Sequence, residues 1–340
     1  MTDTAPKRHS IPEHPIRNGL WRRLLLGRFE QIKVGRLKVY EGSDLILDTG
    51  QAPDGEAVPI YIRSYNAYRA MALGGALGAS EAYMDGDWNC ENLLDVLQLF
   101  LKNRDVMSAM DAGLVKFQAP LRRFQHWLNR DTLAQSKRNI AAHYDLGNTF
   151  FEQFLDQTMT YSSGYFVDPQ QTMLEGSEQK LDLICRKMKL KPSDHILEIG
   201  TGWGGFALHA AKHFGCKVTT TTISQAQFEW ATARVREANL EDRIELLQLD
   251  YRRLEGRFDK IVSIEMIEAV GLKFLPLFFE TCAGLLRPGG SMLLQAITIA
   301  EQRFEAAKRS VDFIQRYIFP GGALASVNEL VGQSASEQAG

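Results

Sequence analysis

The stretch Glu198-Ile199-Gly200-Thr201-Gly202-Trp203-Gly204-Gly205 decides the fold of this chain. It begins at the end of residues 195–199, which read as a strand, and it leads into residues 204–214, whose pattern predicts a helix. Glycines at this spacing let the backbone turn sharply and approach a ligand closely. A strand, a glycine loop and a helix in this order are typical of the first unit of a doubly wound parallel sheet.

The glycines alone leave the ligand of this loop open. Gly200, Gly202 and Gly205 fit the G-x-G-x-x-G spacing of dinucleotide sites. No lysine followed by serine or threonine closes the loop, which argues against a phosphate-binding loop. Glu198, the acidic residue at the strand end, suits a ligand with a cationic amino-acid moiety such as S-adenosylmethionine.

The sequence on both sides of the loop alternates strand and helix patterns. Strands are predicted at residues 195–199, 217–221, 243–249, 258–264 and 291–297, and helices at 204–214, 225–238 and 275–286, with a turn at 288–290. Strands separated by helices indicate an α/β domain with a doubly wound parallel sheet.

A smaller α+β domain is predicted ahead of it. Short strands are expected near residues 37–40, 45–47 and 58–62, followed by helical residues 65–101 with a loop at 85–90. The predicted organisation is a basic tail (1–28), an amino-terminal α+β accessory domain (29–113), a linker (114–138), a larger α/β domain that carries the glycine loop (139–332) and a polar tail (333–340).

Composition excludes several classes of protein. A net charge of −2 gives no basic field for nucleic acid, and the four widely spaced cysteines argue against a metal site or a disulfide framework. The cysteines, and an amino terminus without a secretory signal, predict a cytoplasmic protein. The apolar run 274–286 is too short to cross a bilayer, so any membrane contact is expected to be peripheral.

Two basic segments leave alternatives open. Residues 1–28 and 114–138 place arginines and lysines among aromatic or leucine side chains. The first is either a solvated tail that docks a short helix or a contact with anionic lipid head groups. The second is either a solvated linker, which we favour, or a strip at a membrane interface.

Six motifs together resemble the cyclopropane-fatty-acyl-phospholipid synthase family. They are residues 143–148 (HYDLGN), 161–165 (YSSGY), 198–205 (EIGTGWGG), 222–227 (TISQAQ), 263–271 (SIEMIEAVG) and 317–322 (YIFPGG). Residues 78–88 (GASEAYMDGDW) are similar to the accessory domain of that family. The resemblance covers roughly residues 30–330 and implies a Rossmann-like methyltransferase sheet.

The resemblance also implies a site. Residues expected to bind S-adenosylmethionine are Tyr161, Ser162, Glu198, Gly200, Gly202, Gly204, Thr222, Ile223, Gln227, Tyr251 and Arg252. Residues expected at the catalytic centre, where family members hold a bicarbonate ion as base, are Glu268, Ser163, Gln295 and Ile297. No metal is expected. The implied partners are an unsaturated phospholipid at the membrane surface and, as an alternative to a monomer, a second copy of the chain.

The chain also departs from the family pattern. Ser163 stands where many members have cysteine, and Gln295 where they have histidine, although both side chains still donate hydrogen bonds. The chain ends soon after residue 322, which leaves a truncated protein, a fragment or a diverged member as readings. The alternatives to a lipid-modifying enzyme are a small-molecule N-methyltransferase and a non-catalytic lipid-binding remnant.

Overall fold

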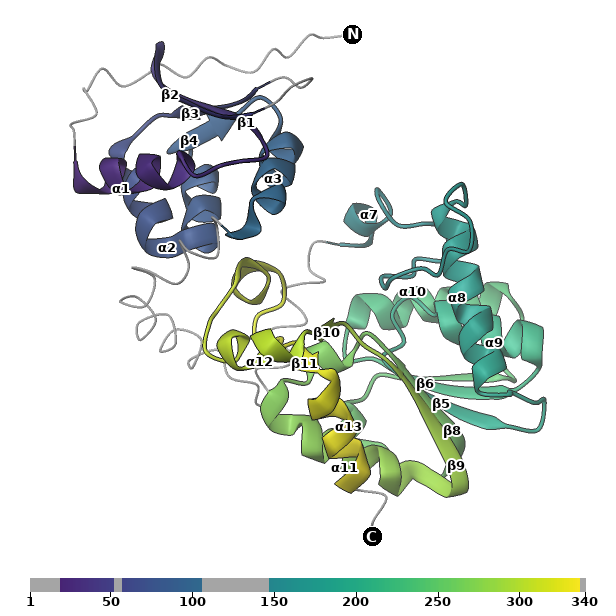
Figure 1. Ribbon diagram of the computed structural model, residues 1–340. Coiled ribbons are helices and arrows are strands. Elements are labelled where there is room, and N and C mark those ends of the chain that lie inside the picture. Colours follow the sequence, from purple (N-terminus) through teal and green to yellow (C-terminus); the bar gives the residue numbers. More distant parts are fainter. Residues whose placement is uncertain (1–18, 52–56, 106–146, 337–340) are drawn as a thin grey trace, which may run out of the picture. The chain divides into compact units, whose positions relative to one another are not determined.

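The computed structural model describes residues 19–51, 57–105 and 147–336, which form two compact units (Figure 1). The expected linker 114–138, the first eighteen residues of the expected basic tail, and residues 143–146 of the HYDLGN motif lie outside the described residues. Each unit has its own hydrophobic core.

In its described residues, the amino-terminal unit consists of a four-stranded sheet and three helices. Its strands are β1 (Gly35–Glu41), β2 (Asp44–Gln51), β3 (Val58–Ile62) and β4 (Trp88–Cys90), in the order β2-β1-β3-β4, and its helices are α1 (Leu20–Phe29), α2 (Tyr65–Met84) and α3 (Leu93–Lys102). Leu25 and Phe29 of α1 are buried in this core, so the second half of the segment expected as a tail contains a docked helix.

Strand β4 corrects the loop that was expected at residues 85–90. Trp88 is 6% exposed and pairs with Ile62 of β3, while its indole nitrogen donates to the carbonyl oxygen of Ala79 at 2.8 Å. Burial of the large Trp88 ring, with its N–H hydrogen-bonded, stabilises this strand. The short, polar sequence around Trp88 did not predict it.

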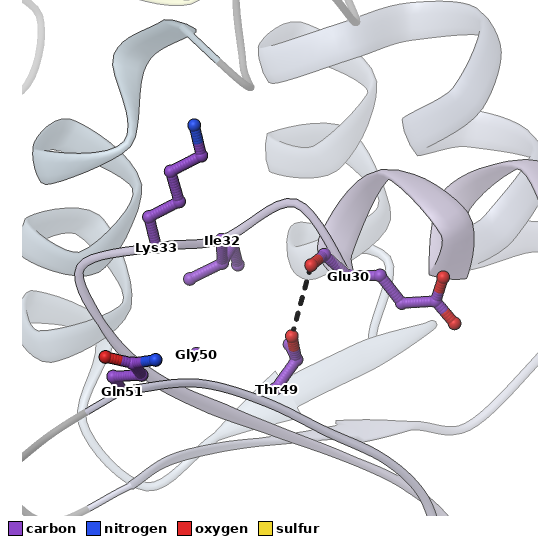
Figure 2. Close-up of a pocket in the computed structure, with 6 residues that line it drawn as sticks. All are labelled: Glu30, Ile32, Lys33, Thr49, Gly50 and Gln51. Atoms are coloured by element: carbon purple, nitrogen blue, oxygen red, sulfur yellow. Dashed lines mark hydrogen bonds between the residues drawn. The ribbon is translucent and has the colours of Figure 1, made fainter.

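The same unit holds a small pocket of about 300 Å³, shown in Figure 2. It is lined by Glu30, Ile32, Lys33, Thr49, Gly50 and Gln51, and the Thr49 hydroxyl donates to the carbonyl oxygen of Glu30 at 3.4 Å. These residues bring together no nucleophile, metal-ligand set or motif, so we assign the pocket no chemistry.

The carboxy-terminal unit is the expected doubly wound sheet. Strands β5 (His195–Ile199), β6 (Lys217–Thr221), β7 (Ile244–Leu247), β8 (Phe258–Ile264) and β9 (Leu286–Gln295) lie in the order β7-β6-β5-β8-β9, and all four pairings are parallel. The order reverses between β5 and β8, and such a switch point is where open α/β sheets bind ligands.

Helices cover both faces of this sheet (Figure 1). They are α8 (Met173–Lys187), α9 (Gly205–Phe214), α10 (Gln225–Glu237), α11 (Leu275–Leu285) and α13 (Val327–Ser336). The described part of this unit also contains the short helices α7 (Asn148–Phe151) and α12 (Glu301–Ala307). Ile196 of β5 packs with α8, α9 and α10, whereas Leu197 packs in the core of α11 on the other face. This alternation follows from the two-residue period of a strand.

Two boundaries in this unit differ from the prediction. The last strand begins at Leu286 rather than at 291 and ends at Gln295, which leaves Ile297 outside it. Residues 288–290 form a bulge within β9, because the register with β8 jumps there. Residues 333–336, expected in a polar tail, belong to α13.

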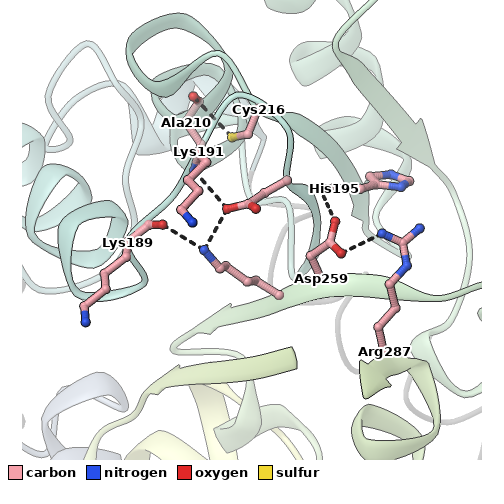
Figure 3. Close-up of polar contacts among 9 residues, drawn as sticks. Lys189, Lys191, His195, Ala210, Cys216, Asp259 and Arg287 are labelled. Carbon is pink, nitrogen blue, oxygen red and sulfur yellow. Dashed lines mark hydrogen bonds and ion pairs between the residues drawn. The ribbon is translucent and has the colours of Figure 1, made fainter. Parts of the chain in front are cut away.

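Polar contacts tie the amino edge of the sheet together (Figure 3). The Asp259 carboxylate accepts hydrogen bonds from the His195 backbone N–H at 2.8 Å and from Arg287 at 2.6 Å. Lys260 pairs with Asp194 at 2.6 Å and donates to a backbone carbonyl at 2.8 Å. These contacts fix where β5, β8 and β9 begin, and the opposite, carboxyl edge receives the glycine loop.

Candidate active site

The glycine loop turns directly after β5 and leaves space above itself. Gly200, Gly202 and Gly204 have φ values of +103°, +53° and +88°, which side-chain-bearing residues rarely adopt. A Cβ atom added at Gly202 would meet no atom within 4 Å, whereas one at Gly200 would lie 3.0 Å from the side chain of Met266. The loop therefore exposes its backbone to a ligand at Gly202 and abuts the residues after β8 at Gly200.

Glu198 lies beneath this loop as a buried carboxylate. Its side chain is 2% exposed and accepts a hydrogen bond from the Thr220 hydroxyl of β6 at 2.5 Å. Burial raises the pKa of Glu198 to about 8, while the hydrogen bond and the positive charge of Lys180 oppose that rise. The side chain expected to bind the cofactor is thus already engaged with the neighbouring strand, and its burial disfavours the charged form.

The second strand end forms an ordered hydrogen-bonded turn. The Thr222 hydroxyl donates to the side-chain oxygen of Gln227 at 2.8 Å and accepts from the Ser224 backbone N–H at 3.1 Å. Thr222 and Gln227 are buried and Ile223 is half-buried. Ser224 caps α10 through the N–H of Gln227. These residues form a pre-ordered wall beside the glycine loop.

The segment after β7 supplies the next expected pair. Tyr251 and Arg252 lie in the short 3₁₀ helix Tyr251–Arg253. The Arg252 guanidinium pairs with both oxygens of Asp250 at 2.8 and 2.7 Å. A bidentate pair of this kind fixes the arginine plane. The expected cofactor residues after β5, β6 and β7 therefore gather at one edge of the sheet, as the parallel topology requires.

Tyr161 and Ser162 lie in an irregular segment before α8. The Tyr161 ring contacts Phe151, Phe154 and Phe319, with ring centroids 5.3, 6.2 and 6.4 Å away. The Ser162 hydroxyl accepts a hydrogen bond from the Lys180 ammonium at 2.5 Å. An aromatic group thus joins this segment to the YIFPGG motif at the other end of the unit. His143 and Asp145 lie outside the described residues.

The four expected catalytic residues lie in two neighbouring sets of hydrogen bonds, one around Glu265 and one around Glu268, and the charges of these two glutamates interact. We call the two sets together the carboxylate cluster: Ser163, Glu265, Glu268, Gln295 and Ile297. Oε1 of Glu265 accepts from the Ser163 backbone N–H at 3.0 Å, from the Ser163 hydroxyl at 2.9 Å and from the Gln295 amide at 2.8 Å. Oε1 of Glu268 accepts from the Ile297 backbone N–H at 2.5 Å.

Burial and charge distinguish the ionisable groups near this cluster. Burial raises the pKa of Glu268, and the nearby charge of Glu265 adds to that rise. Its second oxygen, Oε2, is buried without a hydrogen-bond partner among the described residues. Burial lowers the pKa of Lys180 to about 8, against the pull of Glu265, Glu198 and Asp156. A cation and several carboxylates therefore share a poorly solvated region.

Two members of this region were not predicted as site residues, Lys180 and Glu265. Lys180 is 4% exposed on the buried stripe of α8, next to Leu181 and Ile184. A lysine on an apolar helix stripe was the available signal. Glu265 directly follows a buried strand, and acidic residues there face the ligand edge of a parallel sheet.

Comparison with known proteins fits this arrangement. A sequence model of the mycolic acid cyclopropane synthetase family matches residues 131–339. The chain belongs to this family. It is 36% identical over 299 residues to the tuberculostearic acid methyltransferase UfaA1 of Mycobacterium tuberculosis, covering 82% of this chain and 67% of that protein. It is 34% identical over 305 residues to the cyclopropane-fatty-acyl-phospholipid synthase of Escherichia coli K12, covering 86% and 74%.

A solved structure agrees with these relatives. The mycolic acid cyclopropane synthase CmaA1, complexed with SAH and CTAB, matches with a TM-score of 0.55 and 31% identity, over 59% of this chain and 74% of that one. The resemblance drawn from the motifs and the Rossmann-like fold are confirmed. As a cyclopropane synthetase family member, the chain is an S-adenosylmethionine-dependent methyltransferase of the lipid-modifying kind.

The observed residues suit that cofactor. Gly202 leaves an opening that a side chain would fill, the Glu198 carboxyl group is buried directly beneath the loop, and the Thr222–Gln227 pair is ordered in advance. Among the described residues, no group of histidine, cysteine and carboxylate side chains forms a metal-binding set.

Proposed function

We propose that this chain transfers a one-carbon unit from S-adenosylmethionine to the double bond of an unsaturated phospholipid acyl chain. The product is a cyclopropane or a methyl-branched acyl group. The observation that carries the proposal is the carboxylate cluster directly beside the glycine loop: Met266, between Glu265 and Glu268, contacts the position of Gly200. A reaction that develops positive charge on carbon requires negative potential next to the methyl donor.

Each group at the sheet edge has a role in this proposal. Gly200, Gly202 and Gly204 hold the methionine part, and Thr222, Ile223, Gln227, Tyr251 and Arg252 hold the adenosine side. Bound there, the cofactor supplies an electrophilic methyl group on a sulfonium. Tyr161 offers an aromatic face to that cation, an interaction of about 0.5–2 kcal/mol.

The chemistry then follows from the alkene. Its π electron pair forms a bond to the methyl carbon, and the carbon–sulfur bond breaks with its pair remaining on sulfur. Positive charge develops on the neighbouring acyl carbon, where the carboxylate cluster stabilises it. A base removes a proton from the new methyl group, and the pair of that C–H bond closes the three-membered ring.

Apolar side chains next to the cluster favour a lipid over a small amine. Ile297 is 50% exposed although its backbone N–H is bound to Glu268. The backbone carbonyl of Glu268 accepts from the Ala323 N–H at 2.9 Å, which brings the segment after the YIFPGG motif alongside. Phe319 of that motif contacts the Tyr161 ring. An acyl chain is the class of substrate that such a border fits.

We further propose a peripheral contact with the cytoplasmic face of the membrane. Helix α1 exposes Leu20 by 62% and Leu24 by 41%, with the exposed Arg23 on the same face. Leucine beside arginine suits the boundary between acyl chains and anionic head groups. No helix in the described part of the chain has the length and apolarity to cross a bilayer. Cosedimentation with anionic vesicles should fall for Leu20→Glu/Leu24→Glu, and undiminished binding would contradict this contact.

The test of the function uses purified full chain, S-adenosylmethionine and vesicles of unsaturated phospholipid. Mass spectrometry should show acyl chains heavier by a single CH₂. Glu268→Gln should lower the product, while Glu280→Gln, a matched change at an exposed position of α11, should not. Unchanged lipids would refute the proposal, and methylation of added small amines instead would favour the N-methyltransferase reading.

A further inference from the structure

The donors expected to surround a bicarbonate ion are already engaged by the protein's own carboxylates. Three donors, from Ser163 and Gln295, converge on Oε1 of Glu265, and the Ile297 N–H is bound to Oε1 of Glu268. An anion placed among these residues would have to displace one of the two glutamates. The residues present therefore do not fit a bicarbonate ion.

Charge opposes a third anion at this place as well. Glu265 and Glu268 are close enough for the charge of one to disfavour ionisation of the other. Lys180 is a buried cation, but its charge already interacts with three carboxyl groups, those of Glu265, Glu198 and Asp156. Adding bicarbonate would bring a further negative charge beside Glu265 and Glu268 without a new cation to balance it.

The backbone of Glu265 is bent to deliver its carboxylate to these donors. Its φ of +45° lies in the left-handed region, which is unfavourable for a residue with a side chain. Gln295 holds it at two points: the Gln295 carbonyl accepts the Glu265 N–H at 2.8 Å, and the Gln295 amide donates to Oε1. An acceptor-only group, an ionised carboxylate, matches this set of donors.

The second oxygen of Glu265, Oε2, accepts no hydrogen bond from the described residues, so its lone pairs are available to a reacting group. We infer that Glu265 is the catalytic base of this enzyme and takes the place that bicarbonate holds elsewhere in the family. This inference rests on the proposed function, because it concerns the proton that lipid cyclopropanation releases.

The step balances without any further reactant. Once the methyl carbon has bonded to one alkene carbon, the neighbouring carbon carries the positive charge. Glu265 takes a proton from the new methyl group, and the pair of the broken C–H bond forms the third side of the ring. Glu265 is left as a neutral carboxyl group, which returns its proton to solvent before the next turnover. Burial raises the pKa of Glu268, so the two glutamates differ in environment and only Glu265 is assigned the role of base.

The first experiment measures the dependence of the wild-type enzyme on bicarbonate. The reaction is run with phospholipid vesicles in carbon-dioxide-free buffer, with and without millimolar bicarbonate. We expect the same rate of acyl-chain product in both. Product that forms only with added bicarbonate would overturn the assignment to Glu265 and leave the proposed function intact. Absence of lipid product under both conditions would instead refute the proposed function, and this inference with it.

The second experiment compares two substitutions at the same position. Glu265→Gln keeps the donors occupied but cannot take a proton, so product formation should fall by about 100-fold or more. Glu265→Gly tolerates the positive φ and frees the donors of Ser163 and Gln295. Millimolar bicarbonate should therefore restore activity to the glycine variant and not to the glutamine variant.

Calorimetric affinity for S-adenosylmethionine shows that both variants are folded, and Glu280→Gln serves as the matched surface control. A glutamine variant that keeps wild-type activity would overturn the inference, as would equal restoration of both variants by bicarbonate.

Discussion

The opening above Gly202 makes a quantitative prediction about cofactor binding. Gly202 has φ of +53°, and a Cβ there would meet no protein atom within 4 Å. Gly202→Val should therefore leave the protein folded, because the new side chain enters space that no other part of the described chain occupies. If that space holds the methionine part of S-adenosylmethionine, the same side chain removes the cofactor from its site.

The expected loss of stability and the expected loss of cofactor affinity differ in size and can be measured separately. The left-handed conformation costs a side-chain-bearing residue about 1–2 kcal/mol, which lowers the melting temperature of a unit of this size by roughly 2–8 °C. Loss of cofactor affinity should exceed about 100-fold, or about 2.7 kcal/mol. Thermal melting reports the first quantity and titration calorimetry with S-adenosylmethionine reports the second.

Gly289 provides a matched control for this experiment. It also has a positive φ, +77°, with no atom within 4 Å of an added Cβ, but it lies in the bulge of β9. Gly289→Val should lower the melting temperature by a similar amount and leave cofactor affinity unchanged. The reasoning fails if Gly202→Val binds the cofactor normally, or if both variants lose affinity to the same extent.

Three further outcomes test other parts of the carboxy-terminal unit. Burial, with the charge of His213 adding to it, lowers the pKa of His209 to about 4. Neutral His209 therefore contributes to the stability of the fold above pH 6.5, and this contribution should be lost as the pH falls through 4. Urea unfolding across that range should show a weaker pH dependence for His209→Phe, and an unchanged one would contradict this cause. Phe278→Ala removes a fully buried ring and should lower the free energy of unfolding by about 3–5 kcal/mol, measured by urea unfolding at neutral pH. A loss below about 1 kcal/mol would contradict the tight packing of this ring. Thr222→Val removes the hydroxyl bonded to Gln227 and should weaken cofactor binding about tenfold by calorimetry; equal affinity would remove this pair from the adenosine side.

Much of the site followed from the sequence because its signals are local. The glycine loop, the residues after β6 and the residues after β7 each follow a strand that the local sequence predicted. Parallel pairing then brings the carboxyl ends of those strands to one edge. The cofactor side was therefore predictable from strand order, although the buried engagement of Glu198 with Thr220 was not.

The carboxylate cluster was only partly predictable because its contacts span long distances in sequence. Ser163 lies 102 positions from Glu265 and 132 from Gln295. No short-range sequence pattern predicts whether the donors of Ser163 and Gln295 bind Glu265 or Glu268. The motif pointed to Glu268, whereas the structure directs three of the donors to Glu265.

The amino acid sequence by itself determined the doubly wound architecture, the glycine loop and membership of the family, because helix and strand periods and turn residues act over a few positions. Tertiary structure alone decided that Lys180 would be buried beside Ser162 and that Glu265 would occupy the donors expected for a free anion. Those outcomes depend on burial and on contacts between separate elements, which arise only when the sheet edge is assembled.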